Sequence, residues 1–155
     1  MSALSVQAPG DDSLTPDQIN GVLDAFAAGY AFDGKRVLVI IPDSTRTAPI
    51  GTLFKGLHER LSGRTAALDV IIALGTHPAM SEEAINRRLE ISADERAGKY
   101  GSVRVFNHTW DQPETLEEIG RIPAEQIHEL SGGLFAAEVP VHINRIVENY
   151  DTLLV

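Results

Sequence analysis

Short apolar runs bounded by polar residues recur along the chain. Residues 36–42 and 68–74 are apolar almost throughout and rich in valine and isoleucine. Runs of this length and composition are typical of strands that are covered on both faces. A shorter run at residues 103–106 predicts a third strand.

Three stretches with apolar residues at helical spacing lie before and between these runs. The first begins at Thr15-Pro16-Asp17-Gln18, a capping box with proline at the first helical position, and we expect it to end near Gly29. The second runs from Pro49 to Leu61, with Gly63 as a suitable stop. The third follows Ser81, a capping residue with two glutamates after it.

The pattern is less regular after Trp110. Residues 114–119 and 124–130 both have helical spacing, and Gly132-Gly133 closes the second stretch. The last part of the chain predicts a strand, a short helix and a further strand, at residues 138–143, 144–150 and 151–155.

Strands that alternate with helices predict an α/β fold, here a Rossmann-like three-layer domain with a mostly parallel sheet flanked by helices. A length of 155 residues suits a single domain over 1–155. Residues 1–14 lack periodicity and are expected to form a loose N-terminal arm. Because the chain stops on the apolar run Leu153-Leu154-Val155, we expect it to be the truncated N-terminal domain of a longer protein.

Charge and composition narrow the range of partners. The chain has 22 acidic and 13 basic residues, for a formal charge of −9, which argues against binding to nucleic acid or to an anionic membrane. It contains no cysteine, so disulfides and thiolate chemistry are excluded. No apolar run approaches the roughly 20 residues that span a bilayer, and the N-terminus does not resemble a signal peptide. A cytoplasmic location is expected.

Polar residues follow the first predicted strand directly, as Asp43-Ser44-Thr45-Arg46. In parallel sheets, ligands bind beyond the carboxyl ends of the strands. A helix N-terminus together with Arg46 would favour a phosphate or a carboxylate, and Asp43 could accept a hydrogen bond from a hydroxyl. The same residues are also explained if Asp43 and Thr45 only cap the turn and Arg46 pairs with a surface acid.

The second predicted strand ends in Gly75-Thr76-His77. Gly75 would allow a tight exit, and His77 would share a crevice with Asp43 and Arg46 if the two strands are neighbours. An imidazole there could accept a hydroxyl proton near pH 7. The alternative is a loop histidine that is hydrogen-bonded to the backbone.

Asn107-His108-Thr109-Trp110 repeats this placement at the third strand. His108 could orient the site, or it could lie in a polar loop. The spacing of the histidines does not predict a metal site. Ser131-Gly132-Gly133 matches neither a P-loop nor a dinucleotide-binding turn. Three other histidines are assigned surface or structural roles: His58, His128 and His142.

Four segments carry a combined resemblance: PDSTRTAP at 42–49, ALGTHPAMSEEAINRRL at 73–89, NHTW at 107–110 and VPVHINRIV at 139–147. Together they resemble the N-terminal domain of the nickel-pincer lactate racemase family. The first is similar to that family's P-D-x-T-R-x-x-P motif and the second to its G-T-H motif. The similarity extends from about residue 36 to the end of the chain.

The resemblance implies a 2-hydroxyacid racemase or epimerase that works by hydride transfer with a nickel-pincer nucleotide as cofactor. By match of motif, His77 would be a catalytic base and Arg46 would hold the carboxylate of a small 2-hydroxyacid. Asp43 and Thr45 would help to hold the nucleotide or the substrate. The remaining residues expected to bind substrate or cofactor are Gly75, Thr76 and His108.

Part of the family's machinery has no counterpart in this sequence. The tethering lysine, the nickel-binding histidine and the second catalytic histidine belong to a stretch that would follow the last strand. We therefore expect the domain to be inactive alone and to have the C-terminal domain of the same protein as its partner. Residues 120–137 are longer than the family's usual connector, so the hydroxyacid could differ from lactate.

Two other functions fit the same residues. A non-catalytic α/β module could bind a phosphorylated or carboxylated metabolite at the helix N-terminus, and it would need Arg46 but not His77. A purely structural domain would need neither.

Overall fold

A four-stranded parallel sheet forms the centre of the computed structural model, which describes residues 4–155. The strands lie in the order β3-β2-β1-β6. Their bounds are Arg36–Pro42 for β1, Ala67–Ala73 for β2, Val105–Asn107 for β3 and Thr152–Leu154 for β6. Neighbouring strands are parallel throughout, so their carboxyl ends lie at the same edge. This arrangement confirms the predicted α/β fold with a mostly parallel sheet flanked by helices.

The main core lies on the face of the sheet that carries Val39 and Val70, which are paired neighbours on β1 and β2. Helices α2 (Ile50–Leu61) and α3 (Glu82–Leu89) contribute buried residues to this core, among them Phe54 and Leu89. Each fully buried side chain of this kind stabilises the fold by about 1.5–3 kcal/mol. The sheet therefore holds its strand ends on a well-packed base.

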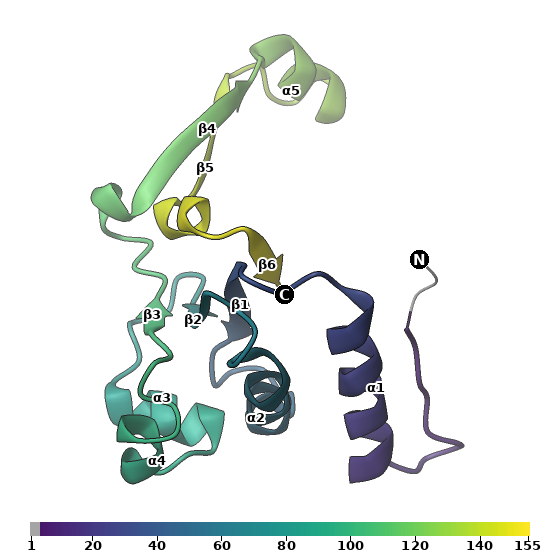
Figure 1. The fold of residues 1–155 in the computed structure, drawn as a ribbon. Helices are drawn as coiled ribbons and strands as arrows, with labels where there is room; N and C mark the ends of the chain where they lie inside the picture. The colour runs from purple at the N-terminus through teal and green to yellow at the C-terminus, as the bar shows by residue number, and fades with distance from the viewer. Residues whose placement is uncertain (1–3) are drawn as a thin grey trace.

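Helix α1 (Pro16–Gly29) packs on α2 and stands at the side of the sheet in Figure 1. Gly56 of α2 allows the close approach, because a Cβ at that position would lie 2.4 Å from Cδ1 of Leu23. Arg60 of α2 fixes the pair with an ion pair to Asp24, at 2.7 Å between Nε and Oδ1. The capping box predicted at Thr15 is formed.

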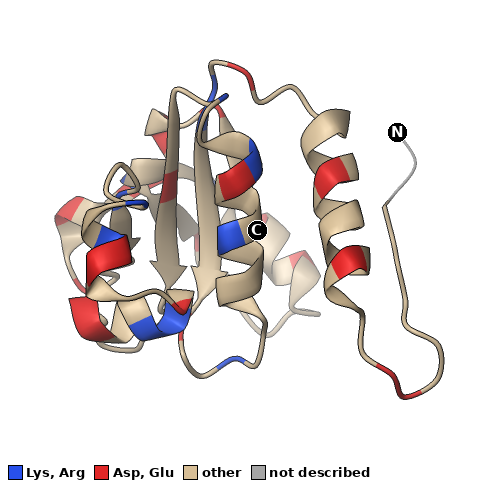
Figure 2. Cartoon of the chain, turned by 60° about the horizontal axis from the view of Figure 1, so that its bottom comes forward, with Lys and Arg blue, Asp and Glu red and all other residues tan. Residues whose placement is uncertain are grey.

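The other face of the sheet carries Leu38, Asp69 and Ile71, all buried. The 3₁₀ helix η2 (Arg145–Asn149) leads to Tyr150, whose hydroxyl donates a hydrogen bond to Asp69 over 2.7 Å. Within the four strands of this sheet only Arg36 and Asp69 are charged, whereas charged residues are frequent on the helices (Figure 2). Asp69 is therefore a buried charge that needs partners.

A two-stranded antiparallel ribbon projects from the sheet, with helix α5 (Ala124–Leu130) at its far end in Figure 1. Its strands are β4 (Leu116–Ile122) and β5 (Val139–Asn144). The prediction of a helix over 114–119 is wrong: only the short 3₁₀ helix η1 (Pro113–Thr115) forms before β4. Pairing with β5 overrides the helical spacing, and the register shifts between Glu118 and Gly120.

The third strand also differs from its prediction. It begins at Val105, not at residue 103, because the Arg104 N–H donates to the side chain of Asp69 at 2.8 Å. Val103 is buried in the core instead. A short helix that was not predicted, α4 (Ala93–Ala97), follows α3 and starts with a capping box between Ser92 and Glu95.

The described part of the N-terminal arm has no regular secondary structure. Residues 4–14 of the predicted arm contain neither helix nor strand, and they run beside α1 in Figure 1. Residues 1–3 lie outside the described part of the chain. Within residues 4–155, no helix has the length and apolar character required to cross a membrane.

Candidate functional site

Asp43 is the first residue after β1, and its buried carboxylate organises the loop that follows. Oδ1 accepts hydrogen bonds from the Thr45 backbone N–H at 3.0 Å and from the Thr45 hydroxyl at 2.5 Å. The turn is also closed by the Arg46 N–H, which donates to the Asp43 carbonyl over 3.4 Å. Asp43 thus caps its own turn, six residues ahead of the N-cap of α2 at Pro49.

His77 lies at the end of the neighbouring strand, β2. The loop leaves the strand through Gly75, which has a φ of 59°, a left-handed conformation that favours glycine. The His77 N–H then donates to the Leu74 carbonyl at 3.0 Å. This turn brings the His77 ring to Asp43, with 2.5 Å between Nδ1 and Oδ2.

The charge state of Asp43 fixes the direction of this hydrogen bond. Hydrogen bonds from the Thr45 hydroxyl and from His77 lower the pKa of Asp43 to about 2, so the carboxylate is ionised at neutral pH. An ionised carboxylate only accepts hydrogen bonds, so Nδ1 of His77 must carry the proton. In the neutral imidazole, Nε2 is then the unprotonated nitrogen, on a side chain that is 53% exposed. The pair presents a base to solvent.

Asn107 and His108, at the end of β3, form hydrogen bonds to two different segments of the chain. The side-chain amide of Asn107 accepts from the Met80 N–H and donates to the Met80 carbonyl, each over 3.0 Å. Nδ1 of His108 accepts from the Asn144 amide at 2.9 Å. Asn144 also caps η2 by accepting from the Ile146 N–H, so His108 is tied to the segment that leads into β6.

The predicted anion-binding residue, Arg46, lies in the exposed loop between β1 and α2. It forms no ion pair with any described residue. The expectation that it pairs with a surface acid therefore has no support in residues 4–155. Gly75 and Thr76 are also exposed in the loop that carries His77.

The first three strand ends thus meet as predicted, but the sequence did not indicate every contact. It did not indicate that Asp43 and His77 are bonded to each other, that Asn107 holds the loop at Met80, or that Asn144 reaches His108. The only advance signal for Asn144 was its position before a predicted short helix, where asparagine is a common cap. His58 is buried beside Phe54 and Tyr100, which agrees with its predicted structural role.

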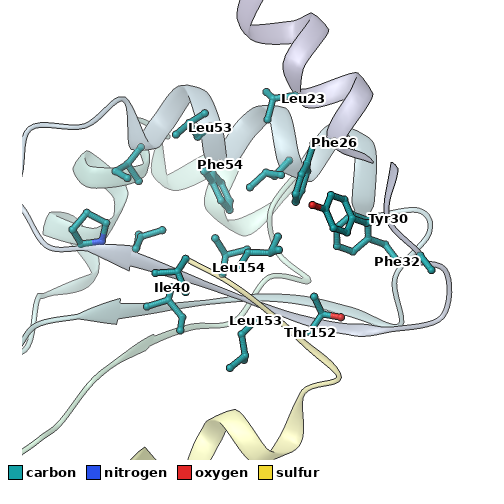
Figure 3. A pocket seen from close by; sticks show the side chains of 17 residues that line it. Leu23, Phe26, Tyr30, Phe32, Ile40, Leu53, Phe54, Thr152, Leu153 and Leu154 are labelled. Carbon is teal, nitrogen blue, oxygen red and sulfur yellow. The ribbon is translucent and has the colours of Figure 1, made fainter. Parts of the chain in front are cut away.

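A separate apolar cavity of about 540 Å³ lies between α1, α2, β1 and β6 (Figure 3). Its lining includes Leu23, Phe26, Phe54 and Leu154, but none of the residues predicted for the site. The polar strand ends and this cavity are therefore distinct features of the molecule.

Comparison with known protein families gives a match over residues 27–155 to the lactate racemase N-terminal domain. The chain belongs to the lactate racemase N-terminal domain family. All four motifs that suggested the resemblance lie inside the matched range. So do Asp43, Arg46, His77 and His108.

A solved structure agrees with this lactate racemase-type fold. The chain is similar to the crystal structure of a protein from Thermotoga maritima, with 30% sequence identity and a TM-score of 0.76. The similarity covers 90% of this chain and 32% of that one, so this domain spans about a third of the length of that protein. A comparison with curated proteins gives no match.

The donor set of the domain suits protons and anions better than metal ions. Residues 4–155 contain no group of three or more His, Asp or Glu side chains that could hold a metal. An imidazole, a carboxylate, hydroxyls and a guanidinium are instead present at the strand ends. These side chains can exchange a proton and bind an anion.

Proposed function

We propose that the longer protein to which this domain belongs is a lactate-type 2-hydroxyacid racemase or epimerase, and that this domain supplies one acid–base group and the substrate-binding loop. The observation that carries the proposal is the Asp43–His77 pair, at 2.5 Å, on the motifs of a lactate racemase N-terminal domain.

His77 is the base in this proposal. Its Nε2 accepts the proton of the substrate hydroxyl while Nδ1–H stays bonded to Asp43. The ionised carboxylate stabilises the imidazolium that forms and keeps the ring in the required tautomer, as the aspartate does in serine hydrolases. When the hydroxyl forms again, the protonated His77 returns the proton to the substrate oxygen and so acts as the acid.

Arg46 binds the substrate carboxylate. A guanidinium forms two parallel hydrogen bonds with a carboxylate, which fixes both the position and the rotation of a small hydroxyacid. The Asp43 loop places Arg46 three residues after the partner of His77, so anion binding and proton transfer are held by one short segment. Fixed geometry of this kind contributes strongly to rate.

The cofactor expected for this family is a nickel-pincer nucleotide. When bound, it would supply the hydride acceptor that the amino acids of this domain lack. The Thr45 and Thr76 hydroxyls, the Gly75 backbone and His108 are the groups at the strand ends that would contact its organic part. By the family resemblance, the nickel-binding histidine and the tethering lysine would lie in a stretch that follows β6.

The test uses the full-length protein, prepared with its cofactor. Racemisation of D- and L-lactate and of other 2-hydroxyacids is followed by chiral chromatography in wild type, His77→Ala and Arg46→Ala. We expect His77→Ala to lower kcat at least 100-fold. Arg46→Ala should raise KM more than it lowers kcat. The control is His128→Ala, since His128 is exposed on α5.

Two results would count against the proposal. Wild-type rates in both site variants would remove the residue assignments. Binding of lactate or phosphate that depends on Arg46 but not on His77, measured by calorimetry and without racemisation of any hydroxyacid, would identify a non-catalytic anion-binding module instead.

A further inference from the structure

The loop that carries His77 is held at two places besides its own turn. On one side the His77 ring meets Asp43 after β1. On the other side the backbone of Met80 meets Asn107 at the end of β3. Because β2 lies between β1 and β3, the loop after β2 is attached to both neighbouring strand ends.

The bond pattern at Met80 requires an amide. Asn107 Oδ1 accepts from the Met80 N–H and Nδ2 donates to the Met80 carbonyl, both at 3.0 Å. One planar side chain therefore satisfies the donor and the acceptor of one residue, much as a neighbouring strand would. An aspartate can only accept when ionised, so it would keep the first bond and place negative charge beside the carbonyl.

Asn107 is itself fixed by the sheet. It pairs with Ile72 as the last residue of β3, and the next N–H, from His108, donates to the Ile72 carbonyl over 3.1 Å. The loop has little other support, since residues 75–79 are exposed and their single backbone bond among the described residues is that of His77 to Leu74. Met80 also packs against the core, and the amide of Asn107 adds the hydrogen-bonded attachment between the rigid sheet and the end of the loop.

We propose that Asn107 is a positioning residue for His77: it holds Met80 so that the imidazole stays in hydrogen-bond contact with Asp43. The inference rests on the proposed function only where it concerns turnover. Its structural part stands on the hydrogen bonds themselves. Displacement of a reacting group by about 1 Å can cost about 100-fold in rate, so loss of this attachment should reduce kcat.

The experiment compares Asn107→Asp with Asn20→Asp in the full-length protein. Asn20 is exposed on α1, and its substitution adds the same charge away from the strand ends. We expect Asn107→Asp, which loses the bond to the Met80 carbonyl and places negative charge beside it, to broaden or remove the downfield NMR signal of the His77 Nδ1 proton. Asn107→Ser, which loses both bonds, should in addition increase the hydrogen exchange rate of the Met80 amide at least tenfold. The kcat should fall about 10- to 100-fold, with KM changed less than threefold.

Several outcomes would overturn the proposal. One is an unchanged Nδ1 proton signal in a folded Asn107→Asp protein. Another is wild-type kcat in that variant when His77→Ala is inactive. If wild type racemises no hydroxyacid, the proposed function fails, and the exchange and NMR measurements still decide the positioning role. If Asn107→Asp does not fold, Asn107→Ser, which removes both bonds without adding charge, is measured in the same way.

Discussion

The hydroxyl of Tyr150 lies 2.7 Å from Oδ2 of Asp69, although 81 residues separate them in the sequence. The same carboxylate oxygen accepts a hydrogen bond from Nε of Arg104 at 3.0 Å. Burial alone would raise the pKa of Asp69, but the hydrogen bonds from Arg104 and Tyr150 outweigh it and hold that pKa below its usual value. Asp69 thus joins β2, the start of β3 and the segment before β6.

Replacement of Tyr150 by phenylalanine should destabilise the domain by about 1–3 kcal/mol, because a hydrogen bond to a buried charge is lost. Urea denaturation at pH 7 measures the change. Tyr30→Phe is the control, since Tyr30 is half-exposed and its hydroxyl bonds to no described residue. It should change the free energy of unfolding by less than about 0.5 kcal/mol. Equal stability of Tyr150→Phe and wild type would contradict the role of the hydroxyl.

The contribution of Tyr150 should also depend on pH. Burial and the hydrogen bond to Asp69 raise the pKa of Tyr150 to about 12, with Arg104 and Arg36 opposing the rise. Its folded pKa is above the unfolded value of about 10, so its contribution is complete below pH 10 and is lost as the pH rises through 12. The difference in stability between wild type and Tyr150→Phe should therefore shrink from pH 10 to pH 12. A constant difference over that range would show that Tyr150 does not titrate as described.

Thr45→Val should raise the pKa of Asp43 from about 2 toward its ordinary value, because the Thr45 hydroxyl is the main cause of the lowering. Carbon-13 NMR of the carboxyl group follows the titration directly. Asp33 serves as the internal reference, since its own lowered pKa depends on the hydrogen bond from Arg64 and should not move. If the pKa of Asp43 stays in place, His77 must be its main partner.

Thr45→Val should also change the stability of the domain in acid. A lowered carboxyl pKa adds stability that is present above the unfolded value of about 4 and is lost as the pH falls through about 2. Thr45→Val should lose less stability over this window than wild type does. Denaturation curves collected from pH 5 to pH 2 would detect the difference.

Two glycine substitutions should have opposite effects on stability. Gly56→Ala would place a Cβ 2.4 Å from the buried side chain of Leu23, so that side chain or the two helices must shift, at a cost of about 1–3 kcal/mol. Gly21→Ala on α1 meets no atom within 4 Å and should stabilise the helix by up to about 1 kcal/mol. Urea denaturation of both variants is the measurement. Stabilisation by Gly56→Ala would mean that the two helices can adjust freely.

The parts of the fold that the sequence predicts well are those where local pattern and packing agree. The bounds of β1 match the prediction at 36–42, and α2 ends at Leu61 as expected. The pattern at 116–122 does not predict a strand, because Leu116 and Ile119 have helical spacing and the partner strand lies about 20 residues away, which leaves no local signal. Helix α4 has one local signal, the capping-box spacing of Ser92 and Glu95, but it is too short for a periodic apolar pattern.

The candidate site was predicted to the level of the sheet edge and no further. Parallel pairing of β1, β2 and β3 requires that Asp43, His77 and Asn107 meet at one end. Which of them bond depends on the backbone path of each loop, such as the left-handed turn at Gly75 that brings His77 to Asp43. Those side-chain directions follow from tertiary geometry, which spacing in the sequence does not encode.

The strand order has a consequence for how the chain is made. β1 is paired on one side by β2 and on the other by β6, which is synthesised last of the described strands. While the nascent chain ends between Asn107 and Thr152, the outer edge of β1 keeps its hydrogen-bonding groups unpaired beside an apolar surface. Open edges of this kind template association between chains. Chains truncated within that interval should therefore aggregate through β1.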